Sequence, residues 1–195
     1  MNIAVLVMAA GRSLRFGEDK LAVNLQGVPL GVRTLRLLNP FPFTQRVLIT
    51  SKDKQYLLEE GERLGFQAVV NPHPEEGQSL SVRLGLQAIL QNGTPDGVLF
   101  SVADQPNLSG STVQRVIDAF MACPASIVIP TANGHRGNPV IFPGDILDEL
   151  MHITGDKGGS QVIGRHPERI VTVEVFEQDL MDIDTKEDLS HVDGL

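Results

Sequence analysis

The sequence predicts an α/β protein whose mostly parallel central β-sheet is covered by helices on both faces. Two observations lead to this prediction. Short apolar runs rich in Val, Ile and Leu alternate along the chain with segments of helical spacing, which is typical of a doubly wound sheet. The 195 residues, of which 42% are hydrophobic, are also enough to bury one substantial core. We therefore expect a Rossmann-like three-layer sandwich that forms a single domain over residues 1–195.

Five apolar runs are expected to form the buried strands of this sheet. Each is short and nearly continuous in apolar residues, as in strands that are covered on both faces. They occupy residues 3–9, 46–50, 66–70, 97–103 and 125–130.

Four segments between these runs have helical spacing. In the third, the side chains expected to share one apolar face repeat at helical intervals, while Arg83 and Gln87 lie elsewhere on its surface. The segments are residues 32–38, 54–65, 79–91 and 110–122, and the predicted apolar face of the third consists of Leu80, Leu84, Ala88 and Leu90.

The last third of the chain departs from this alternation. Two β-like runs within residues 127–143 flank Asn133 and Gly134, a dipeptide that favours a tight turn. We expect a hairpin-like excursion beside the sheet. No low-complexity linker precedes it, so the C-terminal part is expected to close over the edge of the sheet.

Charge and cysteine content limit the possible partners. The net charge of −8 argues against a protein that grips nucleic acid along its backbone. Cys123 is the only cysteine, which excludes an intramolecular disulfide and fits a reducing, cytoplasmic location. The apolar amino terminus has no basic region before it and charged residues follow soon after, so neither a signal peptide nor a membrane partner is expected.

The loop after the first predicted strand, "LVMAAGRSLRFGEDKL", is a candidate phosphate-binding loop. Gly11 lets backbone N–H groups approach an anion closely, and Arg12, Arg15 and Lys20 add positive charge in an otherwise acidic protein. The glycine spacing is not that of a Walker loop, and the GxGxxG fingerprint is absent. The alternative is a solvated basic turn.

A second candidate is the aspartate at the end of the fourth predicted strand, in "VADQPNL". Asp104 follows a buried run and Pro106 stops the strand, so the carboxylate is expected at the same sheet edge as the opening loop. A carboxylate that faces phosphates there would suit Mg²⁺. The alternative is an ordinary strand end, followed by a helix that Ser109 or Ser111 caps.

A third candidate is the pair of aspartates in "LMDIDTKEDL". Asp182 and Asp184 alternate along an extended segment and so lie on one side of it. A second metal carboxylate is the functional interpretation, which only proximity to Asp104 would favour. The alternative is that Asp184 caps a final helix.

These stretches, in this order and spacing, resemble the nucleotidyltransferases of the molybdenum-cofactor type, and most of all the molybdenum cofactor cytidylyltransferases. The segments "GQSLSVRLGL", "GHRGNPVIF" and "GDKGG" are similar to further family elements, so the resemblance spans essentially the whole chain. It implies a nucleotide-diphospho-sugar transferase-like fold. It also implies Mg²⁺-dependent transfer of CMP from CTP to the phosphate of the molybdenum-pterin cofactor, with release of pyrophosphate and handover to a molybdoenzyme or its chaperone.

The resemblance also implies roles for individual residues. Lys20, Asp104 and Arg12 would be catalytic, and Mg²⁺ would be held by Asp104 and Asp184, with Asp182 as a further candidate. The nucleotide would contact Ala9, Ala10, Gly11, Arg12, Ser13, Lys20, Gly77, Ser79 and Asp104. The acceptor would contact Arg136, Asn138 and Asp156.

Several of these positions have an ordinary structural alternative. Arg136 has a fork that matches phosphate oxygens, but it could equally pair on the surface. His135, in the same turn, is favoured as a solvated turn residue. Asp156 and Lys157 are interpreted as part of a lid over the acceptor, with an ordinary connection as the alternative.

The choice of base and of reaction leaves rivals open. Cytidylyl enzymes of this group tend to have "AAG" where guanylyl relatives have "AGG", and Ala9-Ala10-Gly11 therefore favours CTP. Lys186 stands where the family usually has proline, which is expected to loosen the start of the last helix rather than abolish the site. The rivals are a nucleotidyltransferase that uses GTP or acts on a sugar phosphate, and a nucleotide-binding module without catalysis.

Overall fold

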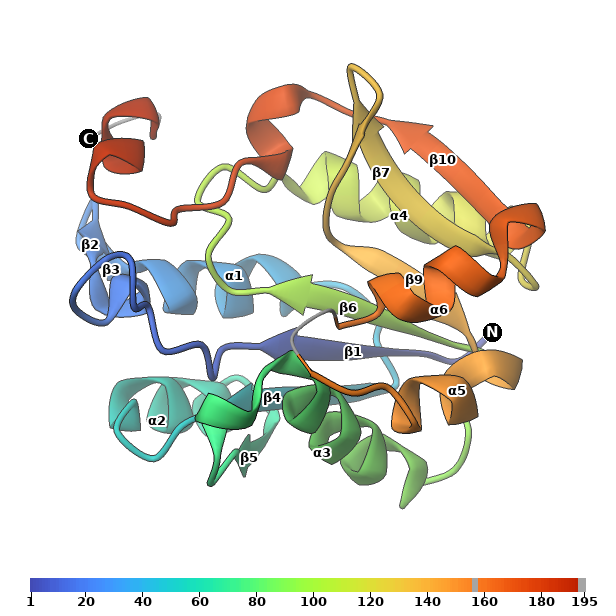
Figure 1. The fold of residues 1–195 in the computed structure, drawn as a ribbon, viewed down its shortest axis with the longest axis horizontal. Coiled ribbons are helices and arrows are strands. Elements are labelled where there is room, and N and C mark those ends of the chain that lie inside the picture. The colour runs from blue at the N-terminus through green and yellow to red at the C-terminus, as the bar shows by residue number, and fades with distance from the viewer. Residues whose placement is uncertain (156–157, 193–195) are drawn as a thin grey trace.

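The computed structural model describes residues 1–155 and 158–192 and contains an extended central sheet with helices around it (Figure 1). The strands are β1 Ile3–Met8, β2 Asn24–Leu25, β3 Val28–Pro29, β4 Gln45–Thr50, β5 Gln67–Val70, β6 Gly97–Val102, β7 Ile127–Ala132, β8 His135–Arg136, β9 Val140–Pro143 and β10 Ile170–Glu174. The helices are α1 Leu30–Leu38, α2 Gln55–Arg63, α3 Gln78–Leu90, α4 Gly110–Ala122, α5 Leu147–Met151 and α6 Ser160–Arg165. None of the helices in the described part of the chain is long and apolar enough to cross a membrane.

The sheet is mostly parallel, as predicted. Its strand order is β10-β7-β9-β6-β1-β4-β5, with β8 added alongside β7. β1 pairs in parallel with β4 and β6, β4 with β5, and β7 with β10. Only β9 and the short β8 run antiparallel to their neighbours. All five predicted strands are present, and β1 lies inside the sheet. The expectation that all five are buried is wrong for β5, which is an edge strand without a buried residue, because it has a neighbouring strand on one side only.

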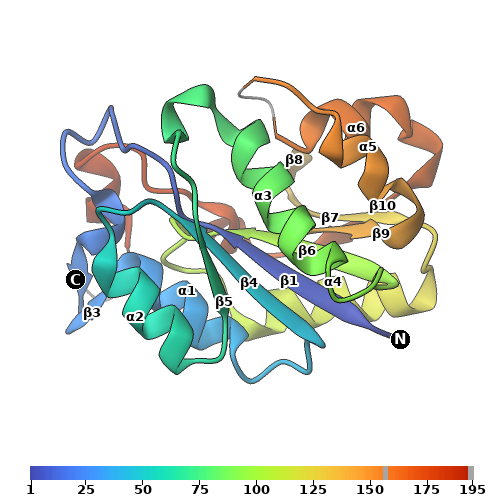
Figure 2. The same cartoon turned by 90° about the horizontal axis from the view of Figure 1, so that it is seen from below.

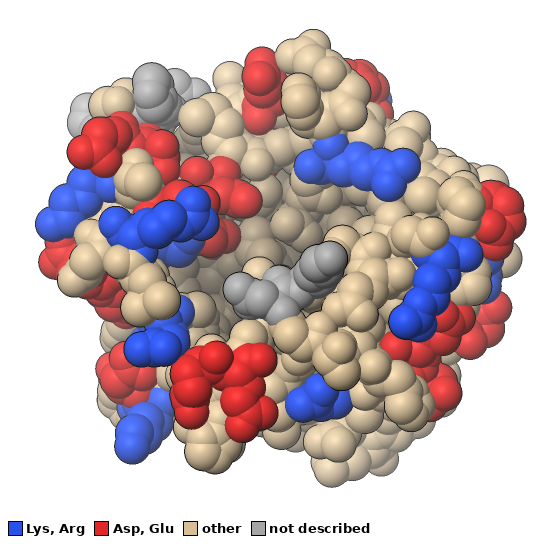
Figure 3. All heavy atoms as spheres, in the orientation of Figure 1, with Lys and Arg blue, Asp and Glu red and all other residues tan. Residues whose placement is uncertain are grey.

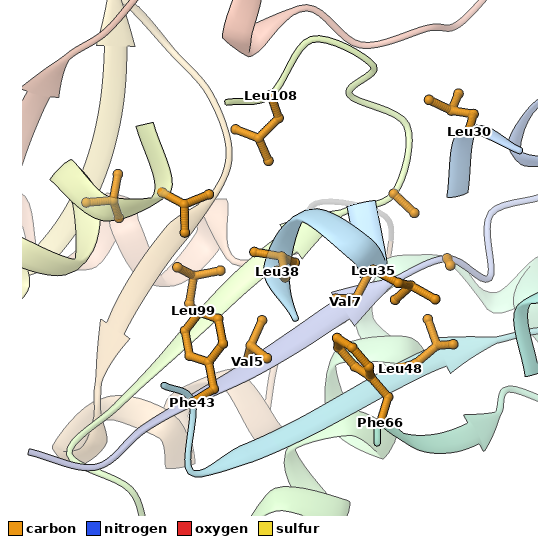
Figure 4. Close-up of a cluster of buried hydrophobic side chains, with 14 of the residues drawn as sticks. Val5, Val7, Leu30, Leu35, Leu38, Phe43, Leu48, Phe66, Leu99 and Leu108 are labelled. Atoms are coloured by element: carbon orange, nitrogen blue, oxygen red, sulfur yellow. The ribbon is translucent and has the colours of Figure 1, made fainter. Parts of the chain in front are cut away.

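Two apolar clusters fill the space between the sheet and its helices. Side chains alternate between the faces of a strand, so Val5 and Val7 of β1 pack with α1, α2 and α4, whereas Ala4 and Leu6 pack with α3, α5 and α6. Figure 2 shows these two sets of helices on opposite faces of the sheet. Figure 4 shows the first cluster, in which Leu35 and Leu38 of α1 lie close to the strands. The result is the predicted three-layer α/β arrangement.

The predicted helices form, but α3 buries a different face from the one expected. Of the four residues predicted to be buried there, only Ala88 is. The reason is the close contact between α3 and β1, since a Cβ added to Gly85 would lie 2.3 Å from the side chain of Leu6. Gly85 therefore lies on the face of α3 that packs against the sheet, whereas Leu80, Leu84 and Leu90 are only partly buried. The buried residues of α3 are Ser79, Ser81, Val82, Gly85, Leu86, Ala88 and Ile89.

The predicted hairpin forms, because β7 and β8 pair antiparallel around Asn133 and Gly134, but its expected place beside the sheet is wrong, because β7 and β9 are both integral strands. β9 lies between β6 and β7 and all four of its residues are buried. Placed beside the sheet, this run of apolar residues would have had no apolar cover. The tight turn itself is confirmed, since Asn133 and Gly134 both have positive φ and connect β7 to β8.

The last predicted helix is a short 3₁₀ helix, Glu187–His191, preceded by Lys186. Asp184 does not cap it through its side chain. Instead, the Asp188 carboxylate accepts the backbone N–H groups of Asp184 and Thr185 at 2.9 and 2.7 Å. The capping alternative for Asp184 is therefore wrong, and its carboxylate is directed elsewhere.

Candidate functional site

A cleft of about 1080 Å³ lies at the carboxyl ends of β1 and β6. One wall is formed by the opening loop and by residues 74–78, and the other by residues 136–138, 159–160 and 163–164. Part of its lining is apolar, from Phe100, Ile129, Val140 and Phe142. Figure 3 shows this face hollowed at its centre, with Lys, Arg, Asp and Glu side chains around the hollow.

The opening loop is folded back on itself by a tight turn. The carbonyl of Ser13, which has a φ of +51°, accepts the N–H groups of Phe16 and Gly17 at 3.0 and 3.1 Å. The Ser13 hydroxyl accepts the N–H of Lys20 at 3.3 Å, and the buried ring of Phe16 anchors the turn in the core. The loop therefore has a defined shape.

Gly11 in this loop is not required by the fold. Its φ is not positive, and a Cβ added there would meet no atom within 4 Å. Because neither backbone strain nor packing demands glycine, the open space over this residue is available to a ligand that approaches the backbone closely. Gly77, by contrast, has a φ of +90°, where glycine is favoured for backbone reasons alone.

Asp19 fixes the end of the loop from which Lys20 projects. Its carboxylate accepts hydrogen bonds from the Lys54 ammonium at 2.6 Å, the Tyr56 hydroxyl at 2.8 Å and the backbone N–H of Leu21 at 3.2 Å. Burial, together with the bond to Asp19, raises the pKa of Tyr56 well above its usual value, so this hydroxyl stays protonated. The opening loop is thus tied to the start of α2.

Lys20 bridges the residues predicted to form the catalytic centre. Its Nζ lies 2.7 Å from Asp104 Oδ2, 3.1 Å from Asp184 Oδ1 and 2.6 Å from the carbonyl oxygen of Ile183. Burial alone would lower the pKa of Lys20, but the charges of Asp104 and Asp184 and the bonds to them outweigh burial and raise it. All three N–H donors of the ammonium therefore have protein oxygens as partners.

The carboxylates around Lys20 carry more negative charge than the lysine neutralises. Asp104 Oδ1 is buried and has no hydrogen-bond partner among the described residues. The pKa of Asp182 is raised to about 7, first by burial and then by the negative charge of Asp104. Asp184 also pairs with Arg15 at 2.8 Å. Three acidic residues from two distant parts of the sequence therefore meet at one end of the cleft.

This donor set suits a divalent cation. Across residues 1–155 and 158–192, no group of three or more His, Cys, Asp or Glu side chains is arranged to hold a metal ion by itself. Mg²⁺ usually takes only one or two protein carboxylates and completes its coordination with water and substrate phosphates. The unpartnered oxygen of Asp104, beside the carboxylates of Asp182 and Asp184, meets that requirement.

Most of the residues predicted from the sequence line this one cleft. Ser79 is an exception, because it is buried in α3 and its N–H donates to the carbonyl of Gly155, while Ser81 lines the cleft instead. Asp156 and the lid predicted there lie outside the described residues. The predicted residues that line the cleft are Ala9, Ala10, Gly11, Arg12, Ser13, Lys20, Gly77, Asp104, Arg136, Asn138, Asp182 and Asp184.

Arg15 is a site residue that the sequence-based list of catalytic residues did not include. It lines the cleft and its ion pair with Asp184 places it nearer the acidic centre than its position on an exposed loop suggests. The sequence shows two arginines in the opening loop, Arg12 and Arg15, and their spacing alone does not reveal which one lies near the acidic centre. Arg136 is exposed on β8 and makes no ion pair within the described residues, so the alternative of surface pairing is not seen.

The sequence matches the family described as MobA-like NTP transferase domain over residues 5–170. It is 25% identical over 203 residues to the Purine catabolism protein PucB of Bacillus subtilis, covering 95% of this chain and 93% of that protein. Shorter matches include a Probable molybdenum cofactor guanylyltransferase of Thermococcus sibiricus, 40% identical over 67 residues, or 34% of this chain and 33% of that protein. Another is the 2-C-methyl-D-erythritol 4-phosphate cytidylyltransferase of Dictyoglomus thermophilum, 35% identical over 53 residues, or 27% and 23%.

Solved structures agree over nearly the whole chain. Rv0371c from Mycobacterium tuberculosis H37Rv is 27% identical with a TM-score of 0.82, and the match covers 98% of this chain and 97% of that one. A complex of the same protein with manganese is 25% identical with a TM-score of 0.80 and covers 98% of each chain. The similarity therefore includes all the segments that form the cleft.

Proposed function

Because this chain belongs to the family of MobA-like NTP transferase domains, we propose that it is a molybdenum cofactor cytidylyltransferase. In this proposal the protein transfers CMP from CTP to the phosphate of a molybdenum-pterin cofactor and releases pyrophosphate. One observation carries it: Lys20, Asp104 and Asp184 converge beside a glycine loop at one end of a large cleft.

The nucleotide occupies the side of the cleft formed by the opening loop and residues 74–78. Ala10 and Gly11 offer a backbone surface that the ribose or base can approach, because no protein atom fills the space over Gly11. Arg12, Arg15 and Lys20 surround the triphosphate with positive charge, in a protein whose net charge is −8. Lys20 exchanges its carboxylate partners for phosphate oxygens when the nucleotide binds.

The reaction is an in-line displacement at the α-phosphorus. An oxygen of the acceptor phosphate forms the new P–O bond, the bond to the β-phosphate oxygen breaks, and pyrophosphate leaves with the electron pair. No general base is needed, because a phosphate nucleophile is already ionised near neutral pH. Asp104 and Asp184, with Asp182 beside them, would hold Mg²⁺, which when bound supplies charge stabilisation to the phosphates.

The acceptor occupies the other side of the cleft. The exposed guanidinium of Arg136 has no ion pair with the described residues, and its fork is suited to phosphate oxygens. The apolar lining beside it, including the edge-on pair Phe100 and Phe142, suits a flat ring system better than a polyol. These features support a phosphorylated pterin as the acceptor.

GTP is the second candidate for the nucleotide. It is favoured by the similarity to probable molybdenum cofactor guanylyltransferases. CTP is favoured by Ala9-Ala10-Gly11 in the opening loop, and a cytidylyltransferase is also among the relatives. The two candidates differ in the base alone, so they share the phosphate and metal chemistry.

The test is thermal unfolding of the purified protein with each of the four nucleoside triphosphates, with and without Mg²⁺. A ligand at about a hundred times its dissociation constant adds about 2.7 kcal/mol, which raises Tm by several degrees in a protein of this size. We expect this shift for CTP with Mg²⁺. A shift for GTP alone would replace the cytidylyl assignment, and no shift with any nucleotide and Mg²⁺ would contradict the proposed function.

A further inference from the structure

The segment that carries Asp182 and Asp184 is not a strand of the sheet. It follows the short 3₁₀ helix Glu177–Leu180 and runs past the carboxyl ends of the strands toward the opening loop (Figure 1). Its backbone joins the end of β6 through the N–H of Ile183, which donates to the carbonyl of Asp104 at 3.0 Å. Its position therefore depends on side chains that fasten it to the rest of the protein.

Asp179, in the 3₁₀ helix that immediately precedes this segment, is among the most buried charged residues that the structure describes. Asp179 is only 2% exposed, and its Oδ2 accepts hydrogen bonds from the hydroxyls of Ser109 and Thr112. Ser109 is the N-cap of the 13-residue helix α4, where the helix dipole also favours a negative charge. A buried carboxylate is costly without such partners, so this contact is specific.

The next attachments follow in chain order. The Gln105 amide donates to the carbonyl of Leu180 at 3.2 Å. Leu180 packs directly over Gly137, where an added Cβ would come within 2.9 Å of it. The segment is thereby held from the strand end of β6, the start of α4 and the turn after β8.

We propose that Asp179 is a positioning residue that sets the distance between the two groups of acidic residues in the cleft. Asp104 lies at one end of the short connection from β6 to α4, and Ser109 lies at the other end. Asp179 bonds to Ser109 and Thr112, at the start of α4. These bonds hold the segment with Asp182 and Asp184 at a fixed position relative to the β6–α4 connection, which also carries Asp104. The effect of Asp179 on metal binding rests on the proposed function, whereas the anchoring of the segment with Asp182 and Asp184 does not.

The fastening is tested by hydrogen–deuterium exchange of the backbone N–H of Ile183 in the Asp179→Ala variant. We expect exchange at least roughly tenfold faster than in the wild type, because the segment opens more often when its buried anchor is lost. Asp118→Ala is the matched control, since Asp118 is an exposed α4 carboxylate that accepts a hydrogen bond from Gln114 of the same helix. Unchanged exchange in Asp179→Ala would overturn the proposal.

The positioning role is tested by the affinity for Mn²⁺ in the presence of CTP, which is measured by water-proton relaxation. Loss of an outer-shell partner typically costs about 10–100-fold in metal affinity, and we expect a weakening of about tenfold in Asp179→Ala, with the CTP-induced Tm shift retained. Faster exchange with unchanged Mn²⁺ affinity would overturn the positioning role. If Asp179→Ala fails to fold, Thr112→Val removes one donor only and should show both effects to a smaller degree. Absence of Mn²⁺ binding in the wild type would count against the proposed function, while the exchange result still decides the fastening.

Discussion

At the scale of single residues, Lys20 is the centre of the site. Its ammonium lies between Asp104 and Asp184, so a cation is already present where a divalent metal would bring positive charge. Metal and lysine therefore compete for the same carboxylates until phosphate oxygens draw the lysine away. This predicts that metal binding without nucleotide is weak in the wild type.

The first prediction is that Lys20→Met binds Mn²⁺ more tightly than the wild type in the absence of nucleotide. Removing a competing unit charge from partly buried carboxylates should increase the affinity about tenfold. Water-proton relaxation measures it, with Lys52→Met as the control, because Lys52 is an exposed lysine outside the cleft. The same variant should lose most of its Tm shift with CTP. Equal Mn²⁺ affinity in Lys20→Met and wild type would contradict the competition.

The second prediction concerns Asp104, which lines the cleft and whose buried Oδ1 has no hydrogen-bond partner among the described residues. Asp104→Asn keeps the shape of the side chain but removes the charge, and pyrophosphate release should fall by at least about a hundredfold, or about 2.7 kcal/mol in the barrier. Circular dichroism should show an intact fold. Turnover close to that of the wild type would remove Asp104 from the metal site.

The third prediction concerns Ala10, which is buried to 5% exposure in the cleft wall. Ala10→Gly opens the backbone to a larger base and should lower the ratio of kcat/KM for CTP over GTP. Steady-state kinetics with both nucleotides measure the ratio. If the ratio stays the same, the base is selected elsewhere in the cleft.

At the scale of elements, the helices on one face of the sheet are joined by a charged cluster. Glu60 of α2 accepts from Arg36 of α1 at 2.9 Å and from Arg63 of its own helix at 2.7 Å. The bond from Arg63, with that from Arg36, lowers the pKa of Glu60 to about 2. Because both arginines are largely exposed, the stabilisation is modest.

The fourth prediction is that Glu60→Gln lowers the free energy of unfolding by about 0.5–1 kcal/mol at pH 7. A carboxyl whose pKa is depressed in the folded state stabilises the protein above its unfolded pKa of 4.5 and loses that contribution as the pH falls toward about 2. Urea unfolding at pH 7 and near pH 2 should therefore show the wild type losing its advantage at the lower pH. Glu62→Gln, a neighbouring exposed position on α2, is the control. A difference that persists unchanged at pH 2 would mean that charge is not the cause.

At the scale of the whole molecule, the sequence predicts the first strands of the sheet better than the last ones, β9 and β10. The five predicted strands are nearly continuous in apolar residues, and four of them lie inside the sheet, whereas β5 lies at its edge. β9 is also a continuous apolar run. Its insertion between β6 and β7, however, depends on contacts with strands that are distant in the sequence or follow a turn. β10 is only partly buried at the edge of the sheet, so it carries a weak apolar signal.

The candidate site was predicted well where the residues are charged and less well where packing decides. Lys20 and Asp104 meet as expected, because β1 and β6 are parallel and deliver their carboxyl ends to one edge, whereas Asp184 reaches them on an extended segment outside the sheet. Ser79 turns away from the cleft because the contact of Gly85 with Leu6 sets the rotation of α3, and no local pattern encodes that contact. Asp179 gave no signal at all, since its partners lie 70 and 67 residues away.

The bridge from Lys20 to Ile183 and Asp184 spans 163 and 164 residues of sequence. Its formation is therefore a late event during synthesis on the ribosome. A nascent chain can pair β1 with β4 and β6 long before Asp184 has been made, so the sheet can exist while the acidic centre does not. A chain that stops short of Ile183 would contain every strand of the sheet and yet leave Lys20 without two of its three partners. Translation itself thus delays assembly of the acidic centre until Asp184 has emerged.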